Sequence, residues 1–158
     1  MDARLGQFLV AQGSLSASQL DHALREQRRS GKPLGVICEQ RLGVSPAKIE
    51  QAWAAQYAAM TCSVDLSQQP PSADTHELLN SRQAWQFGLI PLGWDDGALQ
   101  LATTPGLLYR AHRFATRQLP GPVFFVMTSS DDLQAALERW YPLPGASLPS
   151  ASSTRSAA

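Results

Sequence analysis

The chain has 158 residues, which is enough for one compact domain or two small ones but not for a domain joined to a nucleotide-hydrolysing module. Its 13 Lys and Arg are balanced by 13 Asp and Glu, which excludes a global attraction to DNA, RNA or an anionic membrane. No apolar run approaches the roughly 18 residues that a membrane span needs, so we expect no direct membrane insertion.

The chain contains two cysteines, Cys38 and Cys62. Their spacing does not match a metal site, and no signal peptide precedes them. We therefore interpret both as reduced core thiols, and we expect a cytoplasmic protein.

Residues 1–58 carry the signals of four helices, paired as two helix-loop-helix units. Ser16 opens a capping box ahead of apolar residues that share one helical face. Ser45 occupies the matching position before the last helix, and Pro46 follows at the first helical position, where its missing N–H costs nothing. Gly31 stands where a C-terminal cap is expected. We predict a helical subdomain over this segment.

From residue 59 to residue 141 strands and helices alternate, which is typical of a small α/β module. The strongest signal is Asp95-Asp96-Gly97 between two apolar runs, which predicts a β-hairpin. The other elements are expected, in chain order, to be a short strand at 61–66, a helix at 76–85, a helix at 107–119, a buried strand at 122–128 and a helix at 129–141.

Residues 142–158 are rich in Pro, Ser and Ala and are predicted to form a disordered tail. The expected fold class is therefore α+β. A four-helix module of two tandem helix-loop-helix repeats would be followed by a small α/β module that contains a β-hairpin.

The first 56 residues contain one 24-residue phrase twice, at residues 4–27 and 33–56. At an offset of 29 residues, five positions are identical and the two capping serines fall in the same phase. A helix-loop-helix unit cannot bury its apolar face alone, whereas two copies bury theirs against each other. Packing of this kind explains the leucines and the serines.

The two glycines of the phrase need a further explanation. Gly6 and Gly35 sit inside the first helix of each copy, where glycine costs roughly 1 kcal/mol relative to alanine. Either a second helix or a ligand must come close to the backbone there. Gln27 and Gln56 favour a ligand, because an amide at the end of each second helix offers both a donor and an acceptor. Arg4 adds a planar guanidinium suited to stacking on a purine or pairing with guanine.

The tandem phrases resemble the MshEN domain, which is the N-terminal domain of type II secretion and type IV pilus assembly ATPases. The first copy carries the resemblance through Arg4-Leu5-Gly6, Leu9-Val10, Gly13, Leu15, Leu20, Leu24 and Gln27. A second copy follows after five residues, and the similarity extends over about residues 3–141.

The resemblance implies that the chain binds cyclic di-GMP, with no cofactor and no metal. In the family, leucines lie against the bases and sugars, while the arginine and glutamines contact polar edges. Carried over to this chain, the first half-site would consist of Arg4, Leu5, Gly6, Leu20, Leu24 and Gln27. The second half-site would consist of Leu34, Gly35, Ile49, Trp53 and Gln56. This second copy departs from the family pattern, since Pro33 replaces the arginine and Trp53 replaces a leucine.

Catalytic chemistry is not indicated by the sequence. The chain lacks the G-x-x-x-x-G-K-[ST] loop of the assembly ATPases. His22, His76 and His112 lie in no metal-binding pattern, and Asp95-Asp96 belongs to a turn. Arg28-Arg29 is interpreted as the end of a helix that complements the helix dipole, rather than as a phosphate clamp. We therefore expect no enzymatic activity.

The sequence favours a free-standing cyclic di-GMP receptor that acts in trans on a protein partner, such as an assembly ATPase or an envelope glycosyltransferase. Two alternatives remain open. One is a docking adaptor of a secretion or pilus system that needs no ligand, in which the second phrase only packs the core. The other is an enzyme fragment whose partner chain carries the chemistry. DNA and RNA are not expected as partners.

Overall fold

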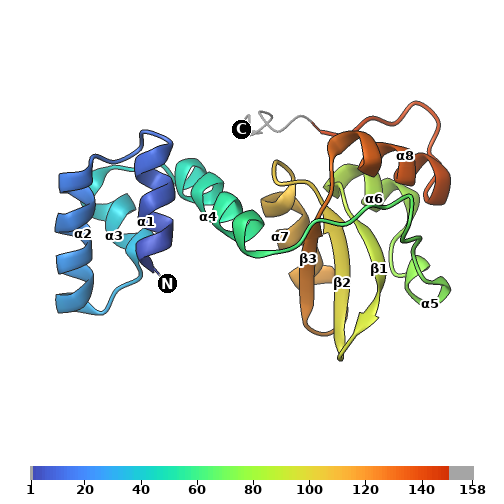
Figure 1. The fold of residues 1–158 in the computed structure, drawn as a ribbon, viewed down its shortest axis with the longest axis horizontal. Coiled ribbons are helices and arrows are strands. Elements are labelled where there is room, and N and C mark those ends of the chain that lie inside the picture. The colour runs from blue at the N-terminus through green and yellow to red at the C-terminus, as the bar shows by residue number, and fades with distance from the viewer. Residues whose placement is uncertain (1, 150–158) are drawn as a thin grey trace. The chain divides into compact units, whose positions relative to one another are not determined.

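The computed structural model describes residues 2–149 and has an α+β fold (Figure 1). The contacts divide the chain between Ala59 and Met60 into two compact units. We call residues 2–59 the helical unit and residues 60–149 the sheet unit. The α+β class expected from the sequence is confirmed. Within residues 2–149, no helix combines the length and the apolar character that crossing a membrane requires.

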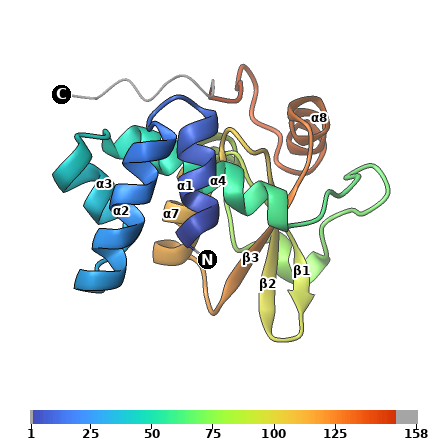
Figure 2. The same cartoon turned by 60° about the vertical axis from the view of Figure 1, so that its left-hand side comes forward.

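Helices alone make up the helical unit (Figure 2). Their bounds are Asp2–Ala11 (α1), Ala17–Ser30 (α2), Leu34–Leu42 (α3) and Pro46–Met60 (α4). The expected capping box is formed, because Ser16 Oγ accepts a hydrogen bond from Gln19 N at 3.1 Å and Gln19 Oε1 accepts one from Ser16 N at 2.9 Å. These two bonds satisfy donors that the first turn would otherwise leave unpaired, so α2 begins at Ala17.

The second helix pair starts and stops with the same residue chemistry. Pro46 is the first residue of α4, and Ser45 Oγ accepts from Lys48 N at 3.4 Å. Gly31 caps α2 and Gly43 caps α3, with left-handed φ values of 71° and 67°. In the repeat, Leu42 occupies the position that corresponds to Gly13 of the first copy. The glycine that caps α3 is therefore one position later in the second copy.

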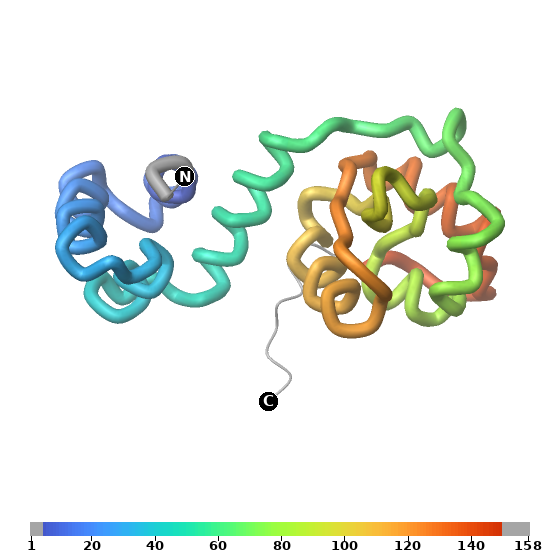
Figure 3. Tube along the Cα trace, turned by 90° about the horizontal axis from the view of Figure 1, so that it is seen from below, coloured from blue at the N-terminus to red at the C-terminus, as the bar shows by residue number. Residues whose placement is uncertain are grey.

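The helical unit has one shared core. Its buried members are Leu9, Leu15, Ala23, Leu34, Ile37, Cys38, Val44 and Ala52, and half-buried Leu5, Phe8, Val10, Leu20, Leu24, Leu42 and Ile49 pack against them. A polar contact also joins the two helix pairs, since Gln12 Nε2 donates to the Lys48 carbonyl at 2.8 Å. Both copies of the phrase contribute to the core, which is the burial that a tandem repeat requires. Figure 3 lets the reader follow the chain through the four helices.

A three-stranded sheet with the order β1-β2-β3 organises the sheet unit. The elements are Ala73–His76 (α5), Ser81–Phe87 (α6), Ile90–Asp95 (β1), Ala98–Thr103 (β2), Leu108–Gln118 (α7), Val123–Met127 (β3) and Ser130–Trp140 (α8). Strands β1 and β2 are antiparallel, with an irregularity between Pro91 and Gly93. Strands β2 and β3 are parallel, and α7 provides the crossover that parallel strands need.

The predicted hairpin is present. Asp95 pairs with Ala98, so the loop consists of Asp96 and Gly97. Their φ values of 48° and 79° both lie in the left-handed region. A two-residue type I′ turn requires this conformation at both positions, and Asp-Gly is among the sequences that favour it.

The short strand predicted at residues 61–66 is not formed as such. The segment makes an isolated parallel bridge between Ser63 and Met127. Val64 N donates to the Met127 carbonyl at 2.8 Å, and Met127 N donates to the Cys62 carbonyl at 2.9 Å. The segment therefore attaches to the edge of β3 over too few residues to count as a strand.

The helix predicted at residues 76–85 is interrupted. Helix α5 ends at His76, and α6 begins at Ser81. The Asn80 side chain accepts from Gln83 N at 2.8 Å while Gln83 Oε1 accepts from Asn80 N at 3.1 Å. This capping box begins α6 at Ser81, inside the segment that was predicted to be one continuous helix. Of the predicted tail, residues 142–149 form irregular structure, and residues 150–158 lie outside the described residues.

Aliphatic and aromatic side chains of the strands, α7 and α8 fill the core of the sheet unit. Fully buried members include Leu99, Leu101, Leu108, Phe125, Leu133 and Leu137. Tyr141 ties the end of α8 to the segment before the sheet, because its hydroxyl donates to the His76 carbonyl at 2.7 Å and its carbonyl accepts from Trp85 Nε1 at 2.7 Å. Burial raises the pKa of Tyr141 to about 12, so the phenol remains a donor.

Thr103→Val is expected to lower the free energy of unfolding by about 1–3 kcal/mol. Thr103 is fully buried, and its hydroxyl donates to the Gly88 carbonyl at 2.7 Å. Valine keeps the shape but leaves that carbonyl without its partner. Thr116→Val is the control, because the exposed Thr116 hydroxyl donates to His112 O within one helix, and the expected change is within about 0.5 kcal/mol. Urea denaturation measures both variants, and equal losses would contradict the prediction.

Candidate functional site

Each repeat glycine lies against the aliphatic residue that occupies the equivalent position on the following helix. A Cβ added to Gly6 would collide with Leu20 Cδ1 and would lie 3.1 Å from Leu20 Cδ2. A Cβ added to Gly35 would lie 3.3 Å from Ile49 Cγ2. Helix α1 therefore approaches α2, and α3 approaches α4, through the same glycine-to-aliphatic contact. Close helix packing, one of the two explanations that the sequence left open, is therefore present at both glycines.

The first predicted half-site lies on α1 and α2. Leu20, Leu24 and Gln27 are spaced as i, i+4 and i+7, so they share one face of α2, and all three are half-buried. Leu5 is half-buried on α1 and packs against the helical core. The backbone of Arg4 belongs to α1, whereas its side chain lies outside the described residues.

The second predicted half-site lies on α3 and α4. Ile49, Trp53 and Gln56 repeat the i, i+4, i+7 spacing and are also half-buried. Tyr57, which the sequence analysis did not single out, places its ring centroid 5.5 Å from that of Trp53. The sequence contains a signal for this contact, because two aromatic residues four positions apart on a helix lie on the same face. Leu34 is only 1% exposed, so its side chain belongs to the core and offers no surface to a ligand.

The structure brings five apolar members of the two half-sites into one cluster: Leu5, Leu20, Leu24, Leu34 and Ile49. Among the described residues, Trp53 is not one of the side chains packed against that cluster. Each copy thus presents a row along its second helix that begins with an aliphatic residue and ends with glutamine. Such a row can place apolar surface against a flat ring and an amide at the edge of the ring.

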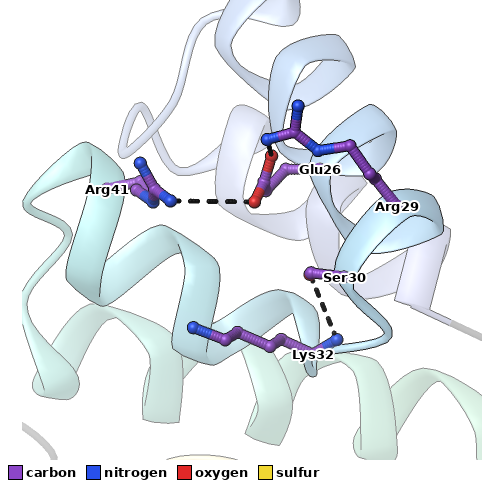
Figure 4. A network of polar contacts seen from close by, with 5 residues as sticks. All are labelled: Glu26, Arg29, Ser30, Lys32 and Arg41. Carbon is purple, nitrogen blue, oxygen red and sulfur yellow. Dashed lines mark hydrogen bonds and ion pairs between the residues drawn. The ribbon is translucent and has the colours of Figure 1, made fainter.

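Cationic side chains surround the C-terminal part of α2 (Figure 4). Glu26 Oε2 lies 2.7 Å from Arg29 Nη2, and Glu26 Oε1 lies 3.8 Å from Arg41 Nη2 on α3. Arg28 Nε donates to a backbone carbonyl one turn earlier, at 3.4 Å. Arg28 and Arg29 both lie in the last turn of α2, and the partners observed for them belong to the same helix.

The two cysteines have different environments. Cys38 is buried in the helical core, where burial and, to a smaller extent, the charge of Glu39 raise the pKa of its thiol. Cys62 is exposed, so the prediction that both thiols are core residues is wrong for Cys62. The reason is that its segment meets the sheet only through an isolated bridge. Within residues 2–149, no group of three or more His, Cys, Asp or Glu side chains could hold a metal ion.

Comparison with known proteins decides the family. A family model described as the MshEN domain matches residues 47–147, which is more than half of the chain. The chain belongs to the MshEN family. Solved structures similar to it include MshE with cdg, at 26% sequence identity and a TM-score of 0.48, covering 87% of this chain and 99% of that one. The N-terminal domain of XpsE is 22% identical with a TM-score of 0.48, covering 89% of this chain and 95% of that one. No curated protein matches the sequence.

The MshEN match and the tandem phrases overlap only in part. The match begins at residue 47, inside α4, and continues past the end of α8. It includes Ile49, Trp53 and Gln56 together with all helices and strands of the sheet unit, whereas the phrase at residues 4–27 precedes it. The resemblance first seen in the tandem phrases is therefore confirmed largely by a different part of the chain.

Gly6→Ala is expected to lower the free energy of unfolding by about 1–2 kcal/mol, because overpacking against Leu20 outweighs the gain in helix propensity. Gly35→Ala is the matched control. There Ile49 must give by only a few tenths of an ångström, and a propensity gain of roughly 1 kcal/mol offsets this cost. Urea denaturation of Gly6→Ala, Leu20→Ala and the double variant measures the contact directly. Strictly additive effects would contradict it.

Iodoacetamide is expected to modify Cys62 at least about tenfold faster than Cys38 in the folded protein. Cys62 is exposed, whereas the Cys38 thiol is buried and has a raised pKa, which lowers its thiolate population. Peptide mass spectrometry after timed quenching at pH 8 measures the two rates. In concentrated urea the rates should converge, and fast labelling of Cys38 without denaturant would be inconsistent with the helical core.

Proposed function

We propose that this chain is a receptor for cyclic di-GMP and that the helical unit binds the ligand. The observation that carries the proposal is the pair of equivalent rows, Leu20-Leu24-Gln27 on α2 and Ile49-Trp53-Gln56 on α4, which are half-buried at the same spacing. Membership of the MshEN family supports the same ligand, in line with what the tandem phrases imply.

The ligand and the rows have matching symmetry and chemistry. Cyclic di-GMP consists of two identical halves, each with a guanine base and a phosphate. A base stacked on a flat side chain contributes about 1–3 kcal/mol, and Trp53, next to Tyr57, is the flat member of its row. Gln27 and Gln56 can both donate to and accept from the edge of a guanine. Two equivalent rows therefore suit two equivalent bases.

The phosphates would meet a weakly basic environment. Residues 1–56 contain seven Lys and Arg against five Asp and Glu. In this proposal Arg4 contributes the cation of the first half-site, and Pro33 leaves the second half-site without its counterpart. Apolar stacking and amide contacts would then supply most of the affinity, and phosphate pairing less.

Ligand binding would act by selecting one arrangement of the helix pairs. A molecule that contacts both rows stabilises the state in which they are held together around it. We propose that this change is passed to a protein partner in trans in the cytoplasm, such as a secretion or pilus assembly ATPase or an envelope glycosyltransferase. The chain itself would have a regulatory role and no catalytic one.

A docking adaptor without a ligand is the second candidate. The contacts Gly6–Leu20 and Gly35–Ile49 account for the repeat glycines by packing alone, and Leu34 is a core residue. In that case the duplicated phrases would serve to build a stable helical surface for another protein of a secretion or pilus system.

Isothermal titration of the full chain with cyclic di-GMP is expected to show saturable binding. Gln27→Ala and Gln56→Ala should each weaken the affinity about tenfold, which is the loss of roughly one hydrogen bond to the ligand. Gln51→Ala is the matched control, because Gln51 is an exposed glutamine on the same helix as Gln56. Arg4→Ala should also weaken binding, with exposed Arg82→Ala of the sheet unit as its control. GTP and cyclic AMP should give no comparable heat, because neither has two guanine halves.

Circular dichroism of each variant separates a lost contact from a lost fold. A folded wild-type chain that shows no heat at high cyclic di-GMP concentration would overturn the receptor proposal and favour the adaptor. Equal affinities of Gln27→Ala, Gln56→Ala and Gln51→Ala would show that the ligand binds elsewhere.

A further inference from the structure

The charges of the sheet unit are segregated, and α7 carries most of the positive share. Residues 60–149 contain five arginines and no lysine, against eight Asp and Glu. Three of the five arginines, Arg110, Arg113 and Arg117, lie on α7, and this helix contains no acidic residue. The rest of the sheet unit is strongly acidic on balance.

The three arginines form a strip along one side of α7, which lies beside β3 (Figure 1). Their spacing of three and four residues confines them to about 60° of the helix circumference and spreads them over about 10 Å of its length. The buried side of the helix is marked by Ala111 and Ala115, which are both fully inaccessible. We call Arg110, Arg113 and Arg117 the arginine strip.

Within residues 2–149, no carboxylate forms an ion pair with the arginine strip. The observed ion pairs of this part of the chain both involve Glu26 of the helical unit. The Arg113 guanidinium lies over the Tyr109 ring, 5.8 Å from its centroid. Arg110 Nη1 donates to the Gln86 carbonyl at 3.2 Å. Because each guanidinium has five N–H donors, these contacts orient two of the side chains and leave most of their donors available.

We propose that the arginine strip is a docking surface for an acidic segment of a partner protein. The segment would present about three carboxylates over about 10 Å, as an acidic helix does with Glu at positions i, i+4 and i+7. Arginine suits this role because its planar fork pairs with a carboxylate through two parallel hydrogen bonds. Charge complementarity is strongest at α7, because the remaining surface of the sheet unit repels an acidic partner.

A protein segment fits this strip better than a membrane does. A helix that lies on a bilayer inserts its apolar face, and the apolar face of α7 is already buried in the sheet unit through residues such as Leu108 and Phe114. This docking surface concerns different residues from the proposed ligand site and does not depend on it.

The test uses the full chain and a fluorescein-labelled synthetic helix of Glu, Ala and Lys residues with Glu at i, i+4 and i+7 on one face. Fluorescence anisotropy at 50 mM salt should show binding that weakens about tenfold or more at 200 mM salt. A peptide with Gln in place of those Glu residues should not bind. Arg113→Gln/Arg117→Gln should weaken binding about tenfold or more, and adding Arg110→Gln should weaken it further.

The matched control is Arg82→Gln/Arg139→Gln, which removes the two arginines of the sheet unit outside α7 and should bind the Glu peptide as wild type does. The double variant Arg113→Gln/Arg117→Gln retains the Arg110–Gln86 contact, so it separates docking from any effect on the fold. The proposal is overturned if the peptide does not bind, or if the α7 and control variants bind equally. Binding of phosphatidylglycerol vesicles, but not of the peptide, through the same arginines would replace it with a membrane surface.

Discussion

The close approach of helices at Gly6 and Gly35 is the contact on which the helical unit depends. Glycine weakens each first helix, but it lets Leu20 and Ile49 reach the opposing backbone. That contact fixes the rotation of α2 and α4 about their axes, because one residue of each helix is held against its partner. The rotation then decides which residues one and two turns later remain half-buried. The two rows that end in Gln27 and Gln56 are therefore a consequence of packing, whatever they bind.

The same contact changes the argument for a ligand. In the sequence alone, the repeat glycines are compatible with either a neighbouring helix or a bound molecule. Since Leu20 and Ile49 occupy the space beside them, the case for cyclic di-GMP now rests on the half-buried residues further along α2 and α4 and on the MshEN family. Leu34, which was predicted to contact the ligand, is likewise a core residue. A smaller set of residues thus carries the proposed site.

The sheet unit combines a different set of forces. A buried core is held together by the hairpin turn, the crossover helix and the hydrogen bonds of Tyr141. The apolar side of α7 is buried in this core. The arginines of α7 are left on the outside of a unit whose other charges are mostly acidic. The chain therefore presents two kinds of surface. One offers apolar and amide groups in repeated rows, and the other offers guanidinium groups that form no ion pair with a carboxylate among residues 2–149.

Signals that act over a few residues could be predicted from the sequence alone. The capping box at Ser16 and the turn at Asp96-Gly97 depend on neighbouring dihedral angles and short-range hydrogen bonds, so they formed as predicted. The cap at Asn80 is equally local and was overlooked. Other features depend on partners far away in the chain. The bridge of Ser63 to Met127, the exposure of Cys62 and the burial of Leu34 were decided by tertiary structure, because strand pairing and core burial depend on groups that are distant in the sequence. The sequence by itself determined the tandem helix pairs and the hairpin. Only the tertiary structure decided that Gly6 faces Leu20 and Gly35 faces Ile49, because a glycine in a helix indicates that a neighbour lies close without indicating which residue it is.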